Sequence, residues 1–159
     1  MAIRKPLVIV AGQVQQLQSG DTLDVSVTET SVVTMTNGEG VAALVPGNAV
    51  YVSANGTVML AGKETSGTKT VLGLAKDDID AGAQGEIVTN GVLTMLTGWW
   101  DAVTGQTGGL TAGKKYYLGS AGALEEGPPT ATDGEYVVEL GIALSTTELK
   151  VEPKTSILL

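Results

Sequence analysis

The sequence predicts an all-β protein: a compact antiparallel barrel or sandwich built from two related β-units, with extended N- and C-terminal arms. Short segments rich in Val, Thr, Leu or Tyr recur along the chain, at a spacing of roughly 8–12 residues that is typical of barrels and sandwiches. Turn-forming Gly, Asn, Asp and Pro separate these segments, and Gly alone contributes 22 residues. Phe is absent, so branched aliphatic side chains must form most of the core, and their small size lets sheets pack closely.

Each predicted strand is a short apolar or Thr- and Tyr-containing run bounded by turn residues. In chain order the strands are Leu7–Val10, Leu23–Val27, Val32–Thr36, Val50–Val52, Val58–Ala61, Val71–Ala75, Glu86–Val88, Val92–Leu96, Lys115–Leu118 and Tyr136–Leu144. Four dipeptides predict tight hairpin turns with positive φ at both central residues: Asn37-Gly38, Asn55-Gly56, Asn90-Gly91 and Asp133-Gly134. No window has convincing helical periodicity, although Lys76–Ala81 and Ser145–Leu149 could each form one turn.

Two stretches of the chain resemble each other. Leu44–Val52 aligns with Leu110–Leu118 as a turn, L-x-x-G, that leads into a Tyr-bearing strand. Val71–Ala75 matches Glu139–Ala143 in the same order, at an offset of roughly 66 to 68 residues. The pattern favours a duplicated β-unit, with chance recurrence in a Gly-rich chain as the alternative. The glycine within each second motif predicts a bulge or a close approach between backbones.

These patterns divide the chain into an N-terminal arm (1–22), a β-rich body (23–153) with repeat-like units at about 40–76 and 106–144, and a C-terminal apolar tail (154–159). Arg4 and Lys5 precede an apolar run, but this run ends at Gly12, too early for the about 7–15-residue core of a signal peptide. No stretch approaches the ~18 apolar residues of a membrane span. Apolar arms are typical of a chain whose terminal segments bind to a neighbouring subunit. Alternatively, both ends complete the protein's own sheet.

Composition argues against several function classes. The net charge of −8 and the pI near 4.4 disfavour direct binding to nucleic acid, whose phosphates repel an acidic surface. His and Cys are both absent, which removes the usual general base, the thiol nucleophile and the commonest metal ligands. Asp77–Gly82 resembles part of a calcium loop, but Thr89 stands where the twelfth-position Glu is required. We therefore expect no catalytic residues, no cofactor and no metal.

The pair Trp99-Trp100 is the most unusual local feature. Neighbouring residues of a strand face opposite sides, so only one of the two rings would enter the core. The other ring could lie in an interface, pack in a loop against the protein's own body, or stack on a sugar.

Two segments resemble known proteins. Ile3–Leu23, which reads IRKPLVIVAGQVQQLQSGDTL, resembles the leader segment of many tailed-bacteriophage fibre and virion proteins. Gly109–Val151 is similar to a module of phage capsid decoration (cement) proteins and fibres, with GLTAG at 109–113, YYL at 116–118 and LGIALSTTEL at 140–149 as its hallmarks. These motifs are structural, so the resemblance implies no active-site residues.

The resemblance implies a structural subunit of a phage virion. We expect a decoration protein that is made in the bacterial cytoplasm, binds the major capsid protein on the capsid exterior, and stabilises the mature head as a homodimer or homotrimer. The alternatives are a small head-fibre or tail-associated adaptor, and a carbohydrate-binding module that uses Trp99, Trp100 and Tyr116–Tyr117. The candidate contact residues are Lys5, Leu7, Val8, Ile9, Val10, Trp99, Trp100, Ile157, Leu158 and Leu159.

Overall fold

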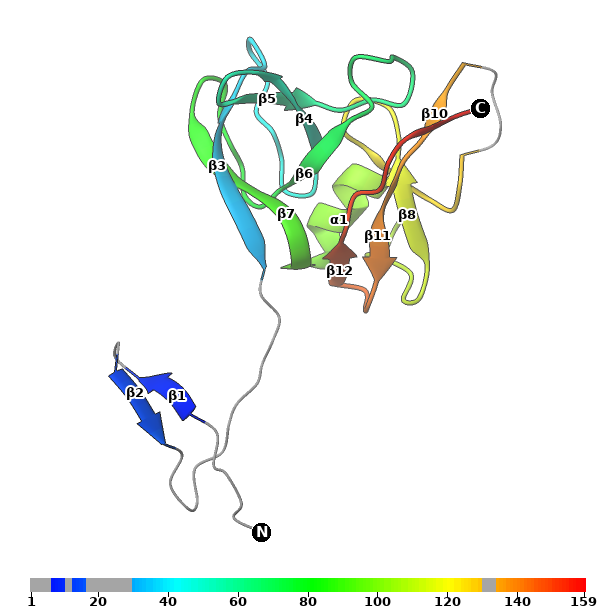
Figure 1. The fold of residues 1–159 in the computed structure, drawn as a ribbon. Helices are drawn as coiled ribbons and strands as arrows, with labels where there is room; N and C mark the ends of the chain where they lie inside the picture. Colours follow the sequence, from blue (N-terminus) through cyan, green and yellow to red (C-terminus); the bar gives the residue numbers. More distant parts are fainter. Residues whose placement is uncertain (1–6, 11–12, 17–29, 130–133) are drawn as a thin grey trace.

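The computed structural model describes residues 7–10, 13–16, 30–129 and 134–159, and these residues form thirteen strands and one helix (Figure 1). In chain order the elements are β1 (Leu7–Val10), β2 (Gln13–Gln16), β3 (Ser31–Asn37), β4 (Ala49–Ala54), β5 (Thr57–Leu60), β6 (Val71–Ala75), β7 (Gln84–Thr94), α1 (Thr97–Thr104), β8 (Lys115–Leu118), β9 (Leu124–Glu126), β10 (Tyr136–Val137), β11 (Glu139–Ala143), β12 (Glu148–Val151) and β13 (Ile157–Leu158).

Nine strands form one sheet in the order β3-β5-β4-β6-β7-β12-β11-β8-β9. An additional pairing of β3 with β7 closes the first five of these strands into a barrel. Every pairing in the sheet is antiparallel except that of β3 with β5. The predicted fold class, an all-β protein with an antiparallel barrel, is therefore confirmed.

The two predicted β-units share one backbone framework, in which β4, β5 and β6 correspond to β8, β9 and β11. Val50 pairs with Gly73 just before a register shift in the first unit, and Tyr116 pairs with Gly141 just before the same shift in the second. The turn glycines match as well: Gly47 N donates to the carbonyl of Ala75 at 2.8 Å, as Gly113 N does to that of Ala143. The repeat inferred from the sequence is therefore a repeat of structure.

Gly73 and Gly141 show why a glycine recurs inside each apolar strand. A Cβ at Gly73 would lie 2.1 Å from the carbonyl oxygen of Val88, and a Cβ at Gly141 would lie 2.0 Å from that of Lys150. Both contacts are with backbone of the next strand, which cannot move aside without breaking the sheet. The predicted close backbone approach is confirmed in both units.

The units differ in how they begin. In the first unit β3 pairs with β7 and then continues to pair in parallel with β5 through Thr36 and Asn37. In the second unit the C-terminal half of β7 takes the place of β3. It pairs with β12 through Val92, just as β3 pairs with β7 through Val32 in the first unit. β7 ends at Thr94, and α1 follows where the first unit has continuous strand. One long strand thus serves both units.

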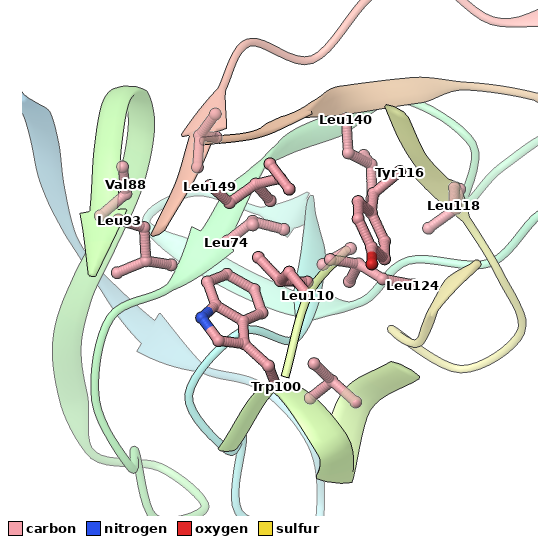
Figure 2. Close-up of a cluster of buried hydrophobic side chains, with 14 of the residues drawn as sticks. Leu74, Val88, Leu93, Trp100, Leu110, Tyr116, Leu118, Leu124, Leu140 and Leu149 are labelled. Carbon is pink, nitrogen blue, oxygen red and sulfur yellow. The ribbon is translucent and has the colours of Figure 1, made fainter. Parts of the chain in front are cut away.

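The buried side chains form two clusters: a smaller one inside the first unit, and a larger one to which both units contribute, with Ala49, Ala61 and Leu74 coming from the first unit. The smaller cluster is entirely aliphatic and consists of Leu44, Val50, Val58, Ala75, Ile79 and Ile87. The larger cluster contains two fully buried aromatic side chains, Trp100 and Tyr116 (Figure 2). Trp100 points from α1 into this cluster, and its indole Nε1 donates to the carbonyl oxygen of Thr147 at 3.0 Å. A side chain from the helix therefore completes the larger cluster.

Several sequence-based expectations of local structure were wrong. One continuous strand, β7, replaces the two predicted strands Glu86–Val88 and Val92–Leu96, and it ends at Thr94. Asn90-Gly91 therefore lies within a strand and forms no hairpin turn. Asn37-Gly38 is no hairpin either: the buried Asn37 amide donates to the carbonyl oxygens of Ala42 and Ile79 and so fastens the end of β3 to two loops.

Asn55-Gly56 does join β4 to β5, but only Gly56, at φ 69°, has a positive φ. Neither predicted helical turn forms, because Ile79 makes a bridge with Leu44 and Glu148–Val151 is strand β12. The strands predicted from the sequence also did not include β2, β9, β12 or β13, and no helix was predicted at α1. The predicted strand Leu23–Val27 and the turn at Asp133 fall outside the described residues.

Candidate interaction surfaces

The first candidate surface is the N-terminal hairpin, formed by β1 and β2. Leu7 to Val10 pair with Gln16 to Gln13 in an antiparallel two-stranded sheet. Among the described residues, neither strand of this hairpin pairs with any strand of the nine-stranded sheet. Lys5, the remaining candidate in this arm, lies outside the described residues. The arm therefore contributes an apolar strand that the body does not need for its own hydrogen bonding.

The second candidate surface is the start of α1. Leu96 is the N-cap residue in an extended conformation (φ −66°, ψ 150°), and Trp99 and Trp100 follow in the first turns of the helix. Successive residues of a helix are rotated by about 100° from one another, so the two rings diverge. Trp100 is fully buried, whereas Trp99 is 38% exposed and Leu96 is 75% exposed.

These positions correct two expectations from the sequence. The tryptophans lie on a helix rather than on a strand, and Trp100 is a core residue, so its assignment as a partner contact was wrong. Leu96 was not among the predicted contacts because the pattern placed it at the end of a strand. We call the exposed pair, Leu96 and Trp99, the α1 ridge.

Two shallow hollows adjoin the α1 ridge. The hollow at the helix start has a volume of about 530 Å³ and is lined by Leu96, Thr97, Gly98 and Trp99. The other has a volume of about 490 Å³ and is lined by Pro46, Lys76, Asp77, Thr94, Met95, Leu96, Trp99 and Thr147. The two hollows therefore share Leu96 and Trp99 as lining residues.

Opposite electrostatic features flank the ridge. On one side Lys76 forms an ion pair with Glu86, and this hydrogen bond raises the pKa of Lys76 above its usual value. Asp77, beside it, is exposed and forms no ion pair within the described part of the chain. On the other side, the N-terminus of α1 has no side-chain cap and no acidic residue in its first turn, so its N–H groups leave a partial positive charge.

The third candidate surface is the C-terminal tail. β13 pairs with β10, and Leu159 N donates to the carbonyl oxygen of Glu135 at 3.0 Å. The tail backbone thus completes the protein's own sheet, which was the alternative considered for the C-terminal end. The side chains of Ile157 and Leu158 nevertheless stay exposed, at 65% and 59%. Any contact by the tail therefore uses side chains on a strand that is already paired.

Two lysines hold this tail sheet against the body. Lys63 Nζ lies 2.9 Å from a carboxylate oxygen of Glu125 and 3.6 Å from one of Glu135, and the hydrogen bond with Glu125 contributes most to raising the pKa of Lys63. Lys69 Nζ lies 3.9 Å from the centre of the Tyr136 ring. These contacts link the first unit to the β9 and β10 region of the second.

The described residues contain no group of three or more acidic, His or Cys side chains placed to hold a metal ion. No helix in the described ranges has the length and apolar character needed to cross a bilayer. Of the aromatic residues expected for a sugar platform, Trp100 and Tyr116 are fully buried and cannot stack on a ligand. Scans against protein-family models and curated proteins found no match to this chain.

Proposed function

We propose that this protein is a decoration protein of a tailed-bacteriophage capsid, which binds the exterior of the mature head through its N-terminal arm and stabilises it. The observation that carries the proposal is that, in the described part of the chain, β1 and β2 pair only with each other. The nine-stranded sheet and its barrel are complete without β1 and β2, so the body does not need the apolar segment Leu7–Val10 for its own strand pairing. The phage-like leader motif includes this same segment.

Charge supports an intermolecular role for the arm. Residues 1–20 contain Arg4 and Lys5 and no acidic side chain, whereas the whole chain has a net charge of −8. A basic, apolar arm on an acidic body can attach to a partner while the net negative charge of the bodies discourages non-specific aggregation.

Stabilisation would follow from mass action. A ligand that binds the mature shell and not its dissociated or immature state lowers the free energy of the mature state by RT ln(1 + [L]/Kd) for each site. At a free concentration of about 100 times Kd this is about 2.7 kcal/mol per site. Many sites on one shell sum to a large effect, so no catalytic group is required.

The direct test is to mix the purified protein with undecorated mature phage shells, and to image them and measure their thermal disruption. We expect regularly spaced density over the shell and a higher disruption temperature. Density confined to one vertex would favour the head-fibre or tail-adaptor alternative, and absence of ordered density would contradict shell binding altogether.

A deletion of residues 1–12 tests the role of the arm. We expect this variant to lose shell binding while its body unfolds at the same temperature as the full chain, because the nine-stranded sheet contains none of these residues. Val41→Ser is the matched control, since Val41 is 98% exposed in a loop of the body and should bind as the parent does. Full-affinity binding by the deletion variant would show that another surface attaches the protein.

A further inference from the structure

We propose that the α1 ridge is a contact through which two copies of this protein pair about a two-fold axis. This contact uses only residues of the body. It is therefore independent of the proposed shell binding by the arm, and either proposal can fail without the other.

The shape of this face suits a contact with itself. Leu96 protrudes and is 75% exposed, and the hollow of about 490 Å³ lies directly beside it. In a two-fold contact the same patch is used by both partners, so a protruding residue next to a depression lets each copy fill the other's hollow. Because Leu96 also lines that hollow, the two leucines would meet close to the axis.

The charges on this face are arranged to match under the same rotation. Asp77 lines one of the two hollows at the ridge, and the uncapped N-terminus of α1 lines the other. A two-fold axis through the ridge reverses this order, so each Asp77 carboxylate faces the helix start of the other copy. A carboxylate is favourable at a helix N-terminus, and opposite potentials across an interface fix its orientation.

The chemistry of the hollow favours a protein partner over a sugar. Pro46, Met95 and Leu96 contribute apolar walls, and the Lys76 ammonium is already engaged by Glu86. Asp77, Thr94 and Thr147 also line this hollow, so the oligosaccharide titration described below is needed to separate a sugar from a second copy. An exposed tryptophan beside a leucine, with aliphatic walls, is typical of the apolar centre of a protein interface.

Sedimentation analysis over a concentration series, without shells, tests the proposal. We expect the full chain to form a dimer reversibly and Leu96→Asp to weaken its association by about 100-fold, because the substitution removes a central apolar contact twice per dimer. Leu96→Asp should still fold, because Asp is among the preferred N-cap residues and Leu96 occupies the N-cap of α1. Circular dichroism and thermal unfolding check this point.

Val41→Asp is the matched control, since it places the same charge on a side chain that is 98% exposed elsewhere on the body. It should leave the dimer intact, whereas Asp77→Lys should weaken it. A monomeric full chain at every concentration, a trimer, or a dimer unaffected by Leu96→Asp would overturn the proposal. So would a change in Trp99 fluorescence on adding oligosaccharides to a chain that stays monomeric.

Discussion

The two units of this protein share a hairpin framework and finish it in different ways. In the first unit β3 runs on to pair with β5, and the enclosed core is small and aliphatic. In the second unit the strand stops at Thr94, α1 replaces its continuation, and Trp100 fills the larger core. The shared part is fixed by backbone contacts that tolerate little change, whereas the closing element has changed from strand to helix.

This difference also determines where an interaction surface can form. A strand that closes a barrel places alternate side chains inside and outside, and its edges are used by its neighbours. The helix instead directs Trp100 inward and leaves Trp99 and the preceding Leu96 outside, beside a helix N-terminus that has no side-chain cap. Helix α1, which completes the larger cluster, therefore also creates the α1 ridge. Among the described residues, the first unit has no counterpart to this ridge.

The largest expected loss of stability comes from a substitution in α1, the helix that closes the second unit. Trp100→Ala should lower the free energy of unfolding by about 3–5 kcal/mol, because it opens a cavity in the larger core and removes one of the two donors to the carbonyl of Thr147, which keeps only the Met95 N–H. Urea denaturation followed by circular dichroism measures this loss. Trp99→Ala, one residue away, should cost less than about 1 kcal/mol. Equal losses in the two variants would contradict the assignment of Trp100 to the core and Trp99 to the surface.

A second prediction tests the framework that the units share. Gly73→Ala and Gly141→Ala should each destabilise the protein by about 1–3 kcal/mol, because the new methyl group meets a backbone carbonyl of the adjacent strand. The two losses should be similar, since the contacts are equivalent. Gly67→Ala, where no heavy atom lies within 4 Å of the added carbon, should change stability by no more than about 0.5 kcal/mol. Tolerance of one substitution but not the other would count against structural equivalence.

The framework could be predicted from the sequence, and the closing elements could not. A glycine inside VLGLA and ELGIA is costly in a strand, so its recurrence pointed to a repeated structural need, which the close approach at Gly73 and Gly141 explains. The helix has no comparable local signal: Thr97–Thr104 contains two Thr and one Gly, which are weak helix formers. Burial of Trp100 and Val103 stabilises it, and that burial depends on distant strands.

Some of the candidate contact residues could likewise be chosen from the sequence, and others could be recognised only from the structure. The unusual Trp99-Trp100 pair drew attention to this part of the chain, but without the helix there was no means of telling which ring is buried or that Leu96 is exposed beside the other. The exposed side chains of Ile157 and Leu158 agree with their selection from the sequence, although β13 is paired with β10. Strands β9 and β12 were missed because charged residues interrupt their short apolar pattern.

The smallest expected effect concerns the link between the two units. Lys63→Met should cost about 1 kcal/mol, because the Lys63 side chain is only 14% exposed and its ammonium contacts both Glu125 and Glu135. Lys115→Met removes an exposed ion pair with Glu139 and should cause no measurable change. Denaturant titrations of the three proteins at constant ionic strength measure the difference.

The pH dependence of the Lys63 effect follows from its raised pKa, which reflects chiefly the hydrogen bond with Glu125. In the unfolded chain a lysine loses its proton near pH 10.4, whereas the folded protein holds this proton to higher pH. The stabilisation is therefore fully present below about pH 10.4 and is lost as the pH rises through the folded-state pKa. The stability gap between the parent and Lys63→Met should stay constant from about pH 7 to pH 9 and shrink above that range. A gap that instead stayed unchanged as the pH rises through the titration of the lysine would mean that packing of the lysine stem, and not its charge, joins the two units.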